Sequence, residues 1–387
     1  MRKTEIIIIG GGVIGASVAY HLTMRGAKDV LILEREAEQG NGSTGKATGG
    51  VRAQFETDIN IKMSLYSIEF FRQFNNLIGV DCGYEPRGYL FFATDDVQLE
   101  YLRRNVEKQK ALGVKGVEIV DTKTIAEMVK GLNCKDITGG SFGANDGFIN
   151  PFGVMEGFTK KAEEAGAKVL RETKVLAIET KNGKVIAVKT NRGRMECDKV
   201  VLCAGAWARE LARTAEIDLP IEPLKRQIVW AKSARDLPEN LPMVIDLGSG
   251  FHFRPAKDSV REVLFAYPDA NETPSFDTNF DESFINRIYE KARQRAPFLA
   301  ETIVVSEKCR AGLYENTPDH HAILGGCEIE NLYFANGFSG HGVMHSPATG
   351  RALAEIMLDG KANFLDVSCL SLQRFANDEL LHETAFI

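Results

Sequence analysis

The chain has 387 residues, is 44% hydrophobic and 26% charged, and carries a formal net charge of -6. This length and composition predict a globular protein of roughly two domains with a sizeable core. The acidic balance argues against a nucleic-acid binder, which carries a basic surface, so we expect no nucleic-acid partner. Apolar runs fall short of the roughly 18 residues of a membrane span, so we also expect no transmembrane segment.

Seven cysteines are present, an odd number, and none belongs to a Cys-x-x-Cys pair. This pattern argues against a disulfide framework and a zinc site, and we expect no metal ion. Reduced cysteines indicate a cytoplasmic protein. The short apolar run at the N-terminus continues into a glycine pattern, so we interpret it as a strand and not as a signal peptide.

The first predicted element is a buried parallel strand over Thr4–Ile9. Gly10, Gly12 and Gly15 follow with the spacing G-x-G-x-x-G, and a helix is predicted over about Val13–Arg25. Such glycines permit a tight turn, close approach of a pyrophosphate and close packing of the helix on the strand. The helix N-terminus directs its N–H groups at the pyrophosphate. The stretch therefore predicts a dinucleotide site.

A second predicted strand, KDVLILE, ends at Glu34. An acidic residue about 20 positions after the glycines, at a strand end, suits a ribose hydroxyl of the dinucleotide. This motif alone does not separate NAD from FAD.

Residues 40–55, GNGSTGKATGGVRAQF, are so rich in Gly, Ser and Thr that we expect neither a helix nor a strand there. A loop this long inside a compact domain is usually functional. Apolar spacing predicts one helix over 57–78. The elements predicted further along are a strand at 88–94, a helix at 96–112, a turn, helix and strand over 147–170, a β-meander over 175–205 with a hairpin at Asn182-Gly183, a helix at 281–296, a strand at 331–337 and a helix from about Pro347.

These elements predict an α/β plus α+β fold, in which a Rossmann-like domain has a mostly parallel sheet and a β-meander. We expect this nucleotide domain to be discontinuous, over 1–81, 144–218 and 319–387. The two insertions, 82–143 and 219–318, are expected to form a mixed-sheet substrate domain.

Six features spread over essentially the whole chain match one family in order. They are GGGVIGAS (10–17), Glu34, GSTGKATGGVRAQF (42–55), VVLCAGAWA (200–208), AGLYENTPDHHAILG (311–325) and GFSGHGVMHSP (337–347). With them the chain resembles the D-amino-acid-oxidase-like flavoproteins, a group that includes sarcosine oxidase, glycine oxidase and the β-subunits of dye-linked L-proline dehydrogenase.

The resemblance implies FAD. A flavin also fits on physical grounds, because reduction places negative charge at its pyrimidine edge and a helix N-terminus stabilises that charge. The turn Gly337–Gly342, before the helix predicted at Pro347, supplies such a terminus. The candidate FAD contacts are Gly10, Gly12, Val13, Ile14, Gly15, Glu34, Arg35, Ser43, Thr44, Lys46, Ala47, Gly49, Gly50, Val175, Ala204, Gly205, Gly312, Gly337, Phe338, Ser339, Gly340, His341, Gly342 and Met344.

Two departures from the family pattern bear on cofactor and substrate. Sarcosine oxidase tethers its flavin through a cysteine in C-M-Y-x-N-T. Here the matching position is Gly312, and Cys309 lies three residues too early, so we expect non-covalent FAD. Met344 stands where relatives carry a lysine that helps to hold the substrate carboxylate. Other residues must take over that role.

The resemblance implies removal of hydride from the Cα–N bond of a small amino acid or secondary amine, L-proline-like or sarcosine-like, leaving an imine. Arg52 is a candidate carboxylate ligand, because arginine grips a carboxylate in a bidentate pair, or else a structural ion-pair partner. Arg310 has the same two interpretations. His252 and Tyr314 are candidates for the substrate pocket, or packing residues. Arg254 joins His252 only if both side chains lie on one face of their strand.

Other histidines and the electron acceptor complete the expectations. His320, His321 and His345 show no metal-ligand spacing. In sarcosine-oxidase relatives a lysine over the flavin promotes reaction with oxygen. Leu264 or an apolar neighbour takes that place here, with Lys225 as an alternative, so we expect slow reoxidation by oxygen.

Two alternatives stay open. One is a peroxide-producing oxidase of glycine, sarcosine or a D-amino acid, and the other is a non-catalytic FAD-holding subunit of a larger complex. The expected partners are a small amino-acid or amine substrate and a partner subunit or another electron acceptor. The expected location is cytoplasmic, or peripheral at the inner membrane face through a partner.

Overall fold

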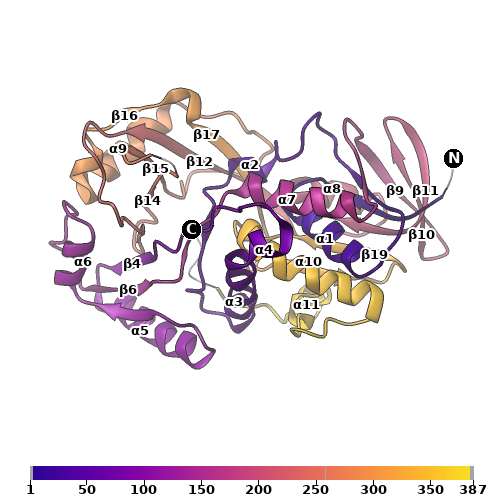
Figure 1. Cartoon of the computed structure of the whole chain (residues 1–387), viewed down its shortest axis with the longest axis horizontal. Helices are drawn as coiled ribbons and strands as arrows, with labels where there is room; N and C mark the ends of the chain where they lie inside the picture. The colour runs from indigo at the N-terminus through magenta and orange to yellow at the C-terminus, as the bar shows by residue number, and fades with distance from the viewer. Residues whose placement is uncertain (1–2, 258, 384–387) are drawn as a thin grey trace.

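Two large β-sheets lie side by side along the long axis of the molecule (Figure 1). The computed structural model describes residues 3–257 and 259–383. Within these residues the first sheet contains β1 (Thr4–Ile9), β2 (Val30–Leu33), β8 (Lys168–Leu170), β9 (Val175–Lys181), β10 (Lys184–Thr190), β11 (Gly193–Leu202), β18 (Ile323–Gly326) and β19 (Leu332–Asn336). Its main order is β18-β19-β11-β1-β2-β8, with β10 paired to β11 and β9.

Strand β1 lies in the middle of this sheet and pairs in parallel with β11 and β2. Ile6 and Ile8 belong to one hydrophobic cluster, whereas Ile7 and Ile9 belong to another, and none of the four is more than 4% exposed. The prediction of a strand buried on both faces is therefore confirmed.

Three helices cover one face of the first sheet. In Figure 1, α1 (Val13–Met24) lies between α7 (Pro151–Glu164) and α10 (Gly342–Asp359), and it packs against both. Ser17 of α1 donates a hydrogen bond to the Ser346 carbonyl of α10, with 2.7 Å between the oxygens. This contact fixes the two helix N-termini next to each other.

The second sheet carries the other half of the molecule. Among the described residues it contains β4 (Tyr89–Ala93), β5 (Val117–Val120), β6 (Gly139–Gly143), β12 (Glu222–Lys232), β13 (Met243–Asp246), β14 (His252–Pro255), β15 (Glu262–Ala266), β16 (Ile303–Val304) and β17 (Arg310–Asn316). The helices around it are α5 (Asp96–Ala111), α6 (Thr122–Met128) and α9 (Ser283–Arg295). β12 pairs along its length with β17 and β15, so these strands form one continuous wall.

The strands divide between the two sheets along the segments expected from the sequence. Those of the first sheet fall in 1–81, 144–218 and 319–387, and those of the second fall in 82–143 and 219–318. The Rossmann-like sheet with its β-meander and the second, mixed sheet are thus confirmed. The assignment of these segments to separate domains stays a prediction.

The predicted hairpin at Asn182-Gly183 is also confirmed. Both residues have positive φ angles, 52° and 73°, and they join β9 to β10. Two consecutive residues with positive φ are what a tight two-residue turn between twisted strands requires.

Three sequence expectations are corrected. The stretch 40–55 is not wholly irregular, because it contains α2 (Ser43–Lys46) and β3 (Gly50–Val51), which pairs with β7 (Gly147–Phe148). The helix expected over 57–78 is two helices, α3 (Asp58–Arg72) and α4 (Phe74–Ile78). The remaining short helices are α8 (Ala208–Arg213) and α11 (Gln373–Ala376).

The third correction concerns the start of α10, which begins at Gly342 and not near Pro347. A proline inside a helix lacks the N–H that would bind the carbonyl four residues earlier. Here that carbonyl belongs to Val343, and the Ser346 hydroxyl donates to it at 2.9 Å. The side chain thus replaces the missing backbone donor, and the helix tolerates Pro347.

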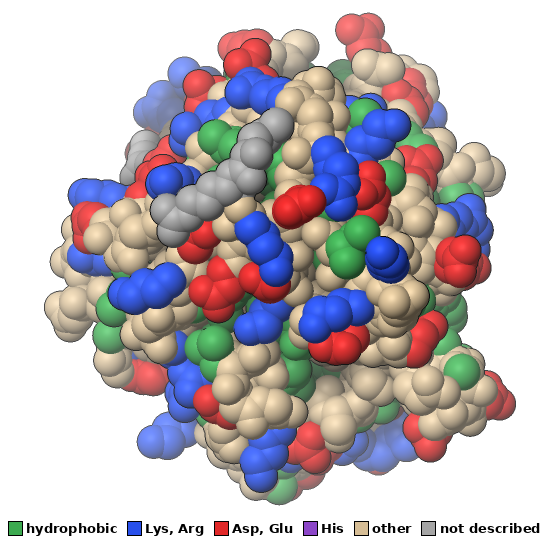
Figure 2. All heavy atoms as spheres, turned by 90° about the vertical axis from the view of Figure 1, so that its right-hand side faces the viewer, with side chains coloured by type: hydrophobic (Ala, Val, Ile, Leu, Met, Phe, Trp, Pro, Cys, Tyr) green, Lys and Arg blue, Asp and Glu red, His purple; other side chains and the backbone are tan. Residues whose placement is uncertain are grey.

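Acidic and basic side chains are mixed on the face around the N-terminal end of the molecule (Figure 2). Arg194 of the meander pairs with Glu179 at 2.7 Å and with Glu196 at 2.6 Å, and Lys184 pairs with Glu330 at 2.8 Å. Across the described residues, no helix is both long and apolar enough to span a membrane.

A buried ion pair anchors the C-terminal segment. Arg374 is 1% exposed and binds Asp319 through two hydrogen bonds of 2.8 and 3.0 Å. It also donates to the carbonyls of Leu370 and His321. Burial raises the pKa of Asp319, but the bonds from Arg374 outweigh this and hold the pKa below its usual value.

We predict that Arg374→Met lowers the free energy of unfolding by about 3–5 kcal/mol, because it leaves Asp319 as an uncompensated buried charge. The double variant that also carries Asp319→Asn should lose less free energy of unfolding than Arg374→Met alone. Urea unfolding measures both, with Arg25→Met, which removes an exposed ion pair with Asp359, as the control. If Arg374→Met costs no more than the control, about 1 kcal/mol or less, the pair is not an anchor.

Candidate functional site

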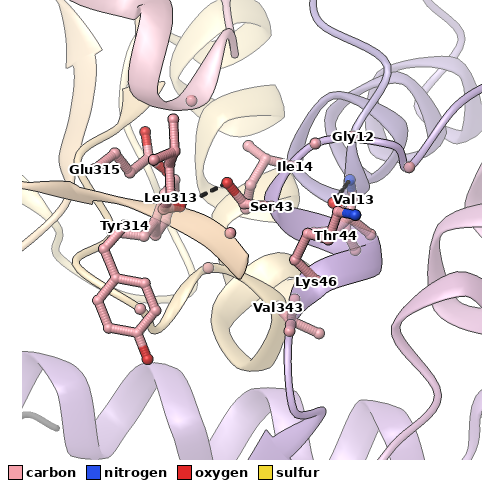
Figure 3. Close-up of a pocket in the computed structure, with 18 of the residues that line it drawn as sticks. Gly12, Val13, Ile14, Ser43, Thr44, Lys46, Leu313, Tyr314, Glu315 and Val343 are labelled. Carbon is pink, nitrogen blue, oxygen red and sulfur yellow. Dashed lines mark hydrogen bonds between the residues drawn. The ribbon is translucent and has the colours of Figure 1, made fainter. Parts of the chain in front are cut away.

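A cavity of about 740 Å³ runs between the two sheets. One end is formed by the turn between β1 and α1 and by Glu34 at the end of β2. The other end is formed by residues of the second sheet, among them Tyr89, His252 and Tyr314. Figure 3 shows Gly12, Val13 and Ile14 on one side of the cavity and the β17 segment on the other. Ligands bind at this strand edge in open α/β sheets.

The glycine turn is shaped for close approach of a ligand. Gly10 has a φ of 109°, and a Cβ there would collide with the Cys203 carbonyl. A Cβ at Gly15 would collide with the Gly10 carbonyl. The N–H of Val13, at the start of α1, donates to the Thr44 hydroxyl at 3.1 Å (Figure 3). The turn therefore leads directly into a helix N-terminus at the cavity wall.

Glu34 holds this turn from the end of β2. Its carboxylate accepts hydrogen bonds from the N–H groups of Gly11, at 2.9 Å, and Glu36, at 3.0 Å. Beside it, the guanidinium carbon of Arg35 lies 3.6 Å from the centroid of the Trp207 ring. Trp207 also lines the cavity, and the sequence analysis did not single it out.

The loop 42–55 is held by hydrogen bonds from the Ser43 side chain and to the loop carbonyls. The Ser43 hydroxyl donates to the Leu313 carbonyl at 2.7 Å (Figure 3). Arg310 donates to the carbonyls of Lys46 and Ala47, at 3.3 and 3.1 Å. Arg254 donates to the carbonyls of Thr48 and Pro255.

These contacts change the interpretation of two arginines. Neither Arg310 nor Arg254 is among the described residues that line the cavity, because their guanidinium groups bind loop carbonyls instead. The structure therefore does not bring Arg310 to a place where it can hold a substrate carboxylate.

At the position of the sarcosine-oxidase cysteine, Gly312 faces the cavity. A Cβ there would lie 2.5 Å from the Cβ of Lys46, so the backbone of β17 approaches the loop closely only because the residue is glycine. The Cys309 thiol is turned elsewhere and accepts the Trp230 N–H at 3.4 Å. All seven cysteines are free.

A second helix N-terminus opens into the cavity. Gly342, Val343 and Met344 begin α10 and line the wall together with Gly340 and His341. The positive end of an 18-residue helix favours negative charge at this place.

Arg52 lies at the substrate-side end and is 3% exposed. It donates to the Gln54 carbonyl, and its guanidinium carbon lies 3.9 Å from the centroid of the Phe55 ring. Burial lowers its pKa, and the carboxylate of Glu383 is the largest opposing influence.

Asp146 fixes the backbone after Arg52. It accepts hydrogen bonds from the Ala53 N–H at 2.7 Å and from the Gln54 amide at 2.9 Å. Burial raises the pKa of Asp146 to about 6, although these bonds oppose the rise. Asp146 thus helps to position Arg52 through the two residues that follow it, Ala53 and Gln54.

His252 is a neutral histidine of defined tautomer. Its Nδ1 lies 2.9 Å from the Gly250 carbonyl, which only accepts hydrogen bonds, so Nδ1 carries the proton and Nε2 keeps its lone pair. Burial lowers the pKa of His252 to about 4. Burial also lowers the pKa of His341, whose ring stands edge-on to Phe55 with 4.9 Å between the centroids.

Besides Trp207, the sequence analysis missed three residues at the substrate-side end of the cavity. Arg226 of β12 lies beside Tyr314, with 5.3 Å from its guanidinium carbon to the ring centroid. Tyr89 lines the same end. Glu315 accepts the Gly337 N–H at 2.9 Å, and burial raises its pKa to about 7. Arg226 can be recognised as a cavity residue only from the pairing of β12 with β17, which places Arg226 opposite Gly312.

The alternation of β12 separates Arg226 from Lys225. The Lys225 ammonium pairs with Asp277 at 2.9 Å and Glu272 at 3.7 Å, and Lys225 is not among the described residues that line the cavity. On β15, Ala266 lines the cavity, whereas Leu264 is buried two residues away. The apolar neighbour, and not Leu264 itself, therefore faces the cavity.

Most of the predicted site residues come together here. Of the candidates, Gly15, Gly337, Ser339 and Arg310 do not line the cavity. Those that do are Gly10, Gly12, Val13, Ile14, Glu34, Arg35, Ser43, Thr44, Lys46, Ala47, Gly49, Gly50, Arg52, Val175, Ala204, Gly205, His252, Gly312, Tyr314, Phe338, Gly340, His341, Gly342 and Met344.

The donor set fits an FAD. It offers a glycine cradle that a Cβ would fill, one helix N-terminus suited to a pyrophosphate and a second suited to the pyrimidine edge. Among the described residues there is no group of three or more His, Cys, Asp or Glu side chains that could hold a metal ion.

Comparisons with known proteins agree with this fit. The chain is 30% identical to FAD-dependent oxidoreductase domain-containing protein 1 of Xenopus laevis, over 99% of this chain and 84% of that protein. The crystal structure of L-proline dehydrogenase from P. horikoshii is similar with a TM-score of 0.89 and 30% identity, covering 98% of this chain and 99% of that one. Mitochondrial dimethylglycine dehydrogenase of Homo sapiens is 27% identical, over 94% of this chain and 43% of that longer protein.

The family described as FAD dependent oxidoreductase, DAO, matches residues 5–356. The resemblance expected from the sequence motifs is thereby confirmed. With this match spanning nearly all of both halves of the fold, the chain belongs to the DAO family of FAD-dependent oxidoreductases.

Proposed function

We propose that this protein is an FAD-dependent dehydrogenase that removes hydride from the Cα–N bond of a small amino acid or secondary amine, L-proline-like or sarcosine-like. One observation carries the proposal. Arg52, His252 and Tyr314 converge on one end of a cavity whose other end is the glycine turn.

FAD, when bound in this cavity, supplies the two-electron acceptor for the hydride. The chain's own residues orient the substrate. Arg52 presents a guanidinium group for the carboxylate, and a buried charge pair of this kind is strongly favourable. His252 offers the lone pair of Nε2 to the substrate N–H, because its other nitrogen is engaged by Gly250. The substrate loses a hydride from Cα and a proton from nitrogen, and water hydrolyses the resulting C=N bond.

The arrangement favours catalysis over a purely structural role. A non-catalytic FAD-holding subunit does not require buried cationic and aromatic side chains at the substrate-side end of the cavity. Arg52 and Tyr314 both line that end. Anaerobic bleaching of the bound flavin by L-proline, sarcosine, glycine or D-amino acids tests the proposal. Unchanged flavin with every one of them would exclude it for these substrates.

We predict that Arg52→Met lowers kcat/KM by a factor equivalent to about 2–5 kcal/mol, because the substrate carboxylate loses its charged partner. Steady-state kinetics with the best bleaching substrate measures the change. Arg72→Met, which removes an exposed pair with Glu69, is the matched control. A kcat/KM equal to that of the control would assign Arg52 to structure.

We predict that the FAD is not covalently bound. Gly312 stands at the tether position, and the Cys309 thiol faces Trp230. Precipitation of the protein with acid should leave a yellow supernatant. Flavin that stays with the washed pellet would contradict this prediction.

We predict slow reoxidation by oxygen, so that electrons pass to a dye, a quinone or a partner subunit. Ala266 offers no positive charge to stabilise superoxide, and Lys225 is held by two carboxylates. Stopped-flow mixing of substrate-reduced enzyme with air-saturated buffer measures the rate. Ala266→Lys should accelerate it, whereas Ala266→Leu should not.

Reoxidation as fast as turnover, with stoichiometric peroxide, would instead support the oxidase alternative. If the Arg226→Met variant then lost this fast reoxidation, Arg226 would be the cation that promotes the reaction with oxygen. A partner subunit, a cytoplasmic location and attachment at the inner membrane face stay predictions of the sequence.

A further inference from the structure

Glu315 is an acidic residue on the cavity wall whose carboxylate has no cationic partner among the described residues. It lies near the end of β17, lines the cavity and is only partly exposed. Its carboxylate accepts the Gly337 N–H, and no lysine, arginine or histidine of residues 3–257 and 259–383 pairs with it. The charged form of such a carboxylate is costly, so the group takes up a proton more readily than an exposed glutamate.

The Glu315 carboxylate binds the turn that leads into α10. Its Oε2 lies 2.9 Å from the nitrogen of Gly337, whose N–H it accepts, and the Glu315 carbonyl accepts the Ser339 N–H at 3.2 Å. Phe338 and the residues Gly340–Met344 line the same cavity as Glu315. The carboxylate therefore lies next to the helix N-terminus that suits the pyrimidine edge of FAD, where reduction places negative charge.

The alternation of β17 separates Glu315 from its neighbour Tyr314. Figure 3 shows the Tyr314 ring and the Glu315 side chain on opposite sides of the strand. The ring meets Arg226 of β12, with 5.3 Å between the guanidinium carbon and the ring centroid, whereas the carboxylate meets the turn before α10. Glu315 is thus placed to respond to charge on the cofactor.

Other titratable groups beside Glu315 keep one charge state near neutrality. At the end of β11, burial raises the pKa of Cys203 and the charge of Glu315 adds to the rise, so this thiol stays protonated. Burial also raises the pKa of Tyr314, which stays a neutral phenol. Before α10, burial lowers the pKa of His341, so its imidazole stays neutral.

Strand β12 is the remaining element that packs along β17. Pro223 lies opposite Glu315, and Lys225 is the charged residue on the same face of β12 as Pro223. The Lys225 ammonium is held by two carboxylates of the segment 272–277. Glu222 and Arg226 alternate to the other face. Glu315 is therefore the group of this region whose charge changes near neutrality.

We propose that Glu315 takes up a proton when the bound FAD is reduced, and that its charge governs how readily the flavin accepts electrons. Reduction adds two electrons and one proton to the flavin and leaves a negative charge on it. Because like charges repel, the Glu315 carboxylate then binds one proton from solvent and becomes a neutral carboxylic acid. This role goes beyond the proposed function, since it concerns the cofactor and holds for any substrate.

The influence of Glu315 on the flavin grows as the pH rises. Burial raises the pKa of Glu315 to about 7, and the N–H groups of Gly337 and Phe338 oppose that rise. Above this pH the carboxylate is charged and opposes reduction, whereas below it the neutral acid does not. Linkage is reciprocal, so a tenfold rise in proton affinity on reduction is also a tenfold change in the redox equilibrium.

Equilibration with a reference dye measures this influence without any substrate. The holoenzyme and a two-electron dye of known potential are reduced slowly together without oxygen, from about pH 6 to about pH 9, and absorbance gives the equilibrium constant between them. Glu315→Gln removes the charge but keeps an oxygen that can accept the Gly337 N–H. At about pH 9 this variant should shift the equilibrium about tenfold toward reduced flavin, and at about pH 6 it should match the wild-type protein.

Two further variants and a spectrum separate charge from structure. Glu210→Gln is the matched control, because Glu210 is an exposed carboxylate on the cavity wall, and it should leave the equilibrium unchanged. Glu315→Asp, which keeps an ionisable group, should retain part of the pH dependence. The spectrum of the reduced wild-type protein should remain that of anionic flavin, because the added proton is on Glu315. FAD content and thermal unfolding confirm that each variant is folded.

A Glu315→Gln variant that keeps the wild-type equilibrium at every pH would overturn the proposal. The same shift at every pH would also overturn it, since Glu315 would then act through the turn and not through its charge. So would loss of the pH dependence in Asp146→Asn instead, because the proton would then go to Asp146, whose pKa burial raises to about 6.

The wild-type protein alone decides the matter if Glu315→Gln does not fold. Near about pH 8 its reduction should take up more than one proton per flavin, measured with a pH indicator in weak buffer, and uptake of one proton or less would contradict the proposal. The proposed function is tested separately by substrate bleaching, and its failure would leave these measurements unaffected.

Discussion

The position of the loop 42–55 is the constraint on which the site depends. This loop lies between the two sheets, and residues from both halves of the molecule bind it. Arg310 and Arg254, from the second sheet, bind the carbonyls of residues 46–48. Ser43 returns a bond to the Leu313 carbonyl of β17. These bonds to the carbonyls of residues 46–48 fix the loop conformation beside the cavity.

That arrangement separates two kinds of arginine. The guanidinium groups of Arg310 and Arg254 bind carbonyls of the loop. These two arginines therefore affect the cofactor only by shaping the cavity wall. Arg52 and Arg226 project into the cavity. Asp146 holds the backbone next to Arg52 from the β6–β7 connection. The guanidinium group of Arg226 lies over the ring of Tyr314. The positive charge at the substrate end is therefore built by the loop after β3 and by β12 of the second sheet.

The sequence predicted what is local and left open what depends on pairing. The glycine spacing, Glu34 and the buried Thr4–Ile9 strand follow from short-range rules, and the structure agrees with them. The prediction that Arg310 lines the cavity was wrong, because a strand pattern does not show whether a guanidinium group binds a backbone carbonyl or points into a cavity. Arg226 was missed because Lys225 and Arg226 are adjacent charges, and only the register with β17 shows which one faces inward. The start of α10 was misjudged because the bond from Ser346 to the Val343 carbonyl compensates for Pro347.

The histidines around the cavity carry no charge across the physiological range. Burial lowers the pKa of His252 to about 4 and that of His345 to about 3, and it lowers the pKa of His341 well below its usual value. All three are therefore neutral at pH 7, and the arginines alone supply the positive charge. The protons that change near neutrality are those on Glu315, with its pKa of about 7, and on Asp146, with its pKa of about 6. Histidine titration therefore leaves the positive charge of the cavity unchanged near pH 7, while the step that needs an unprotonated amine depends on pH.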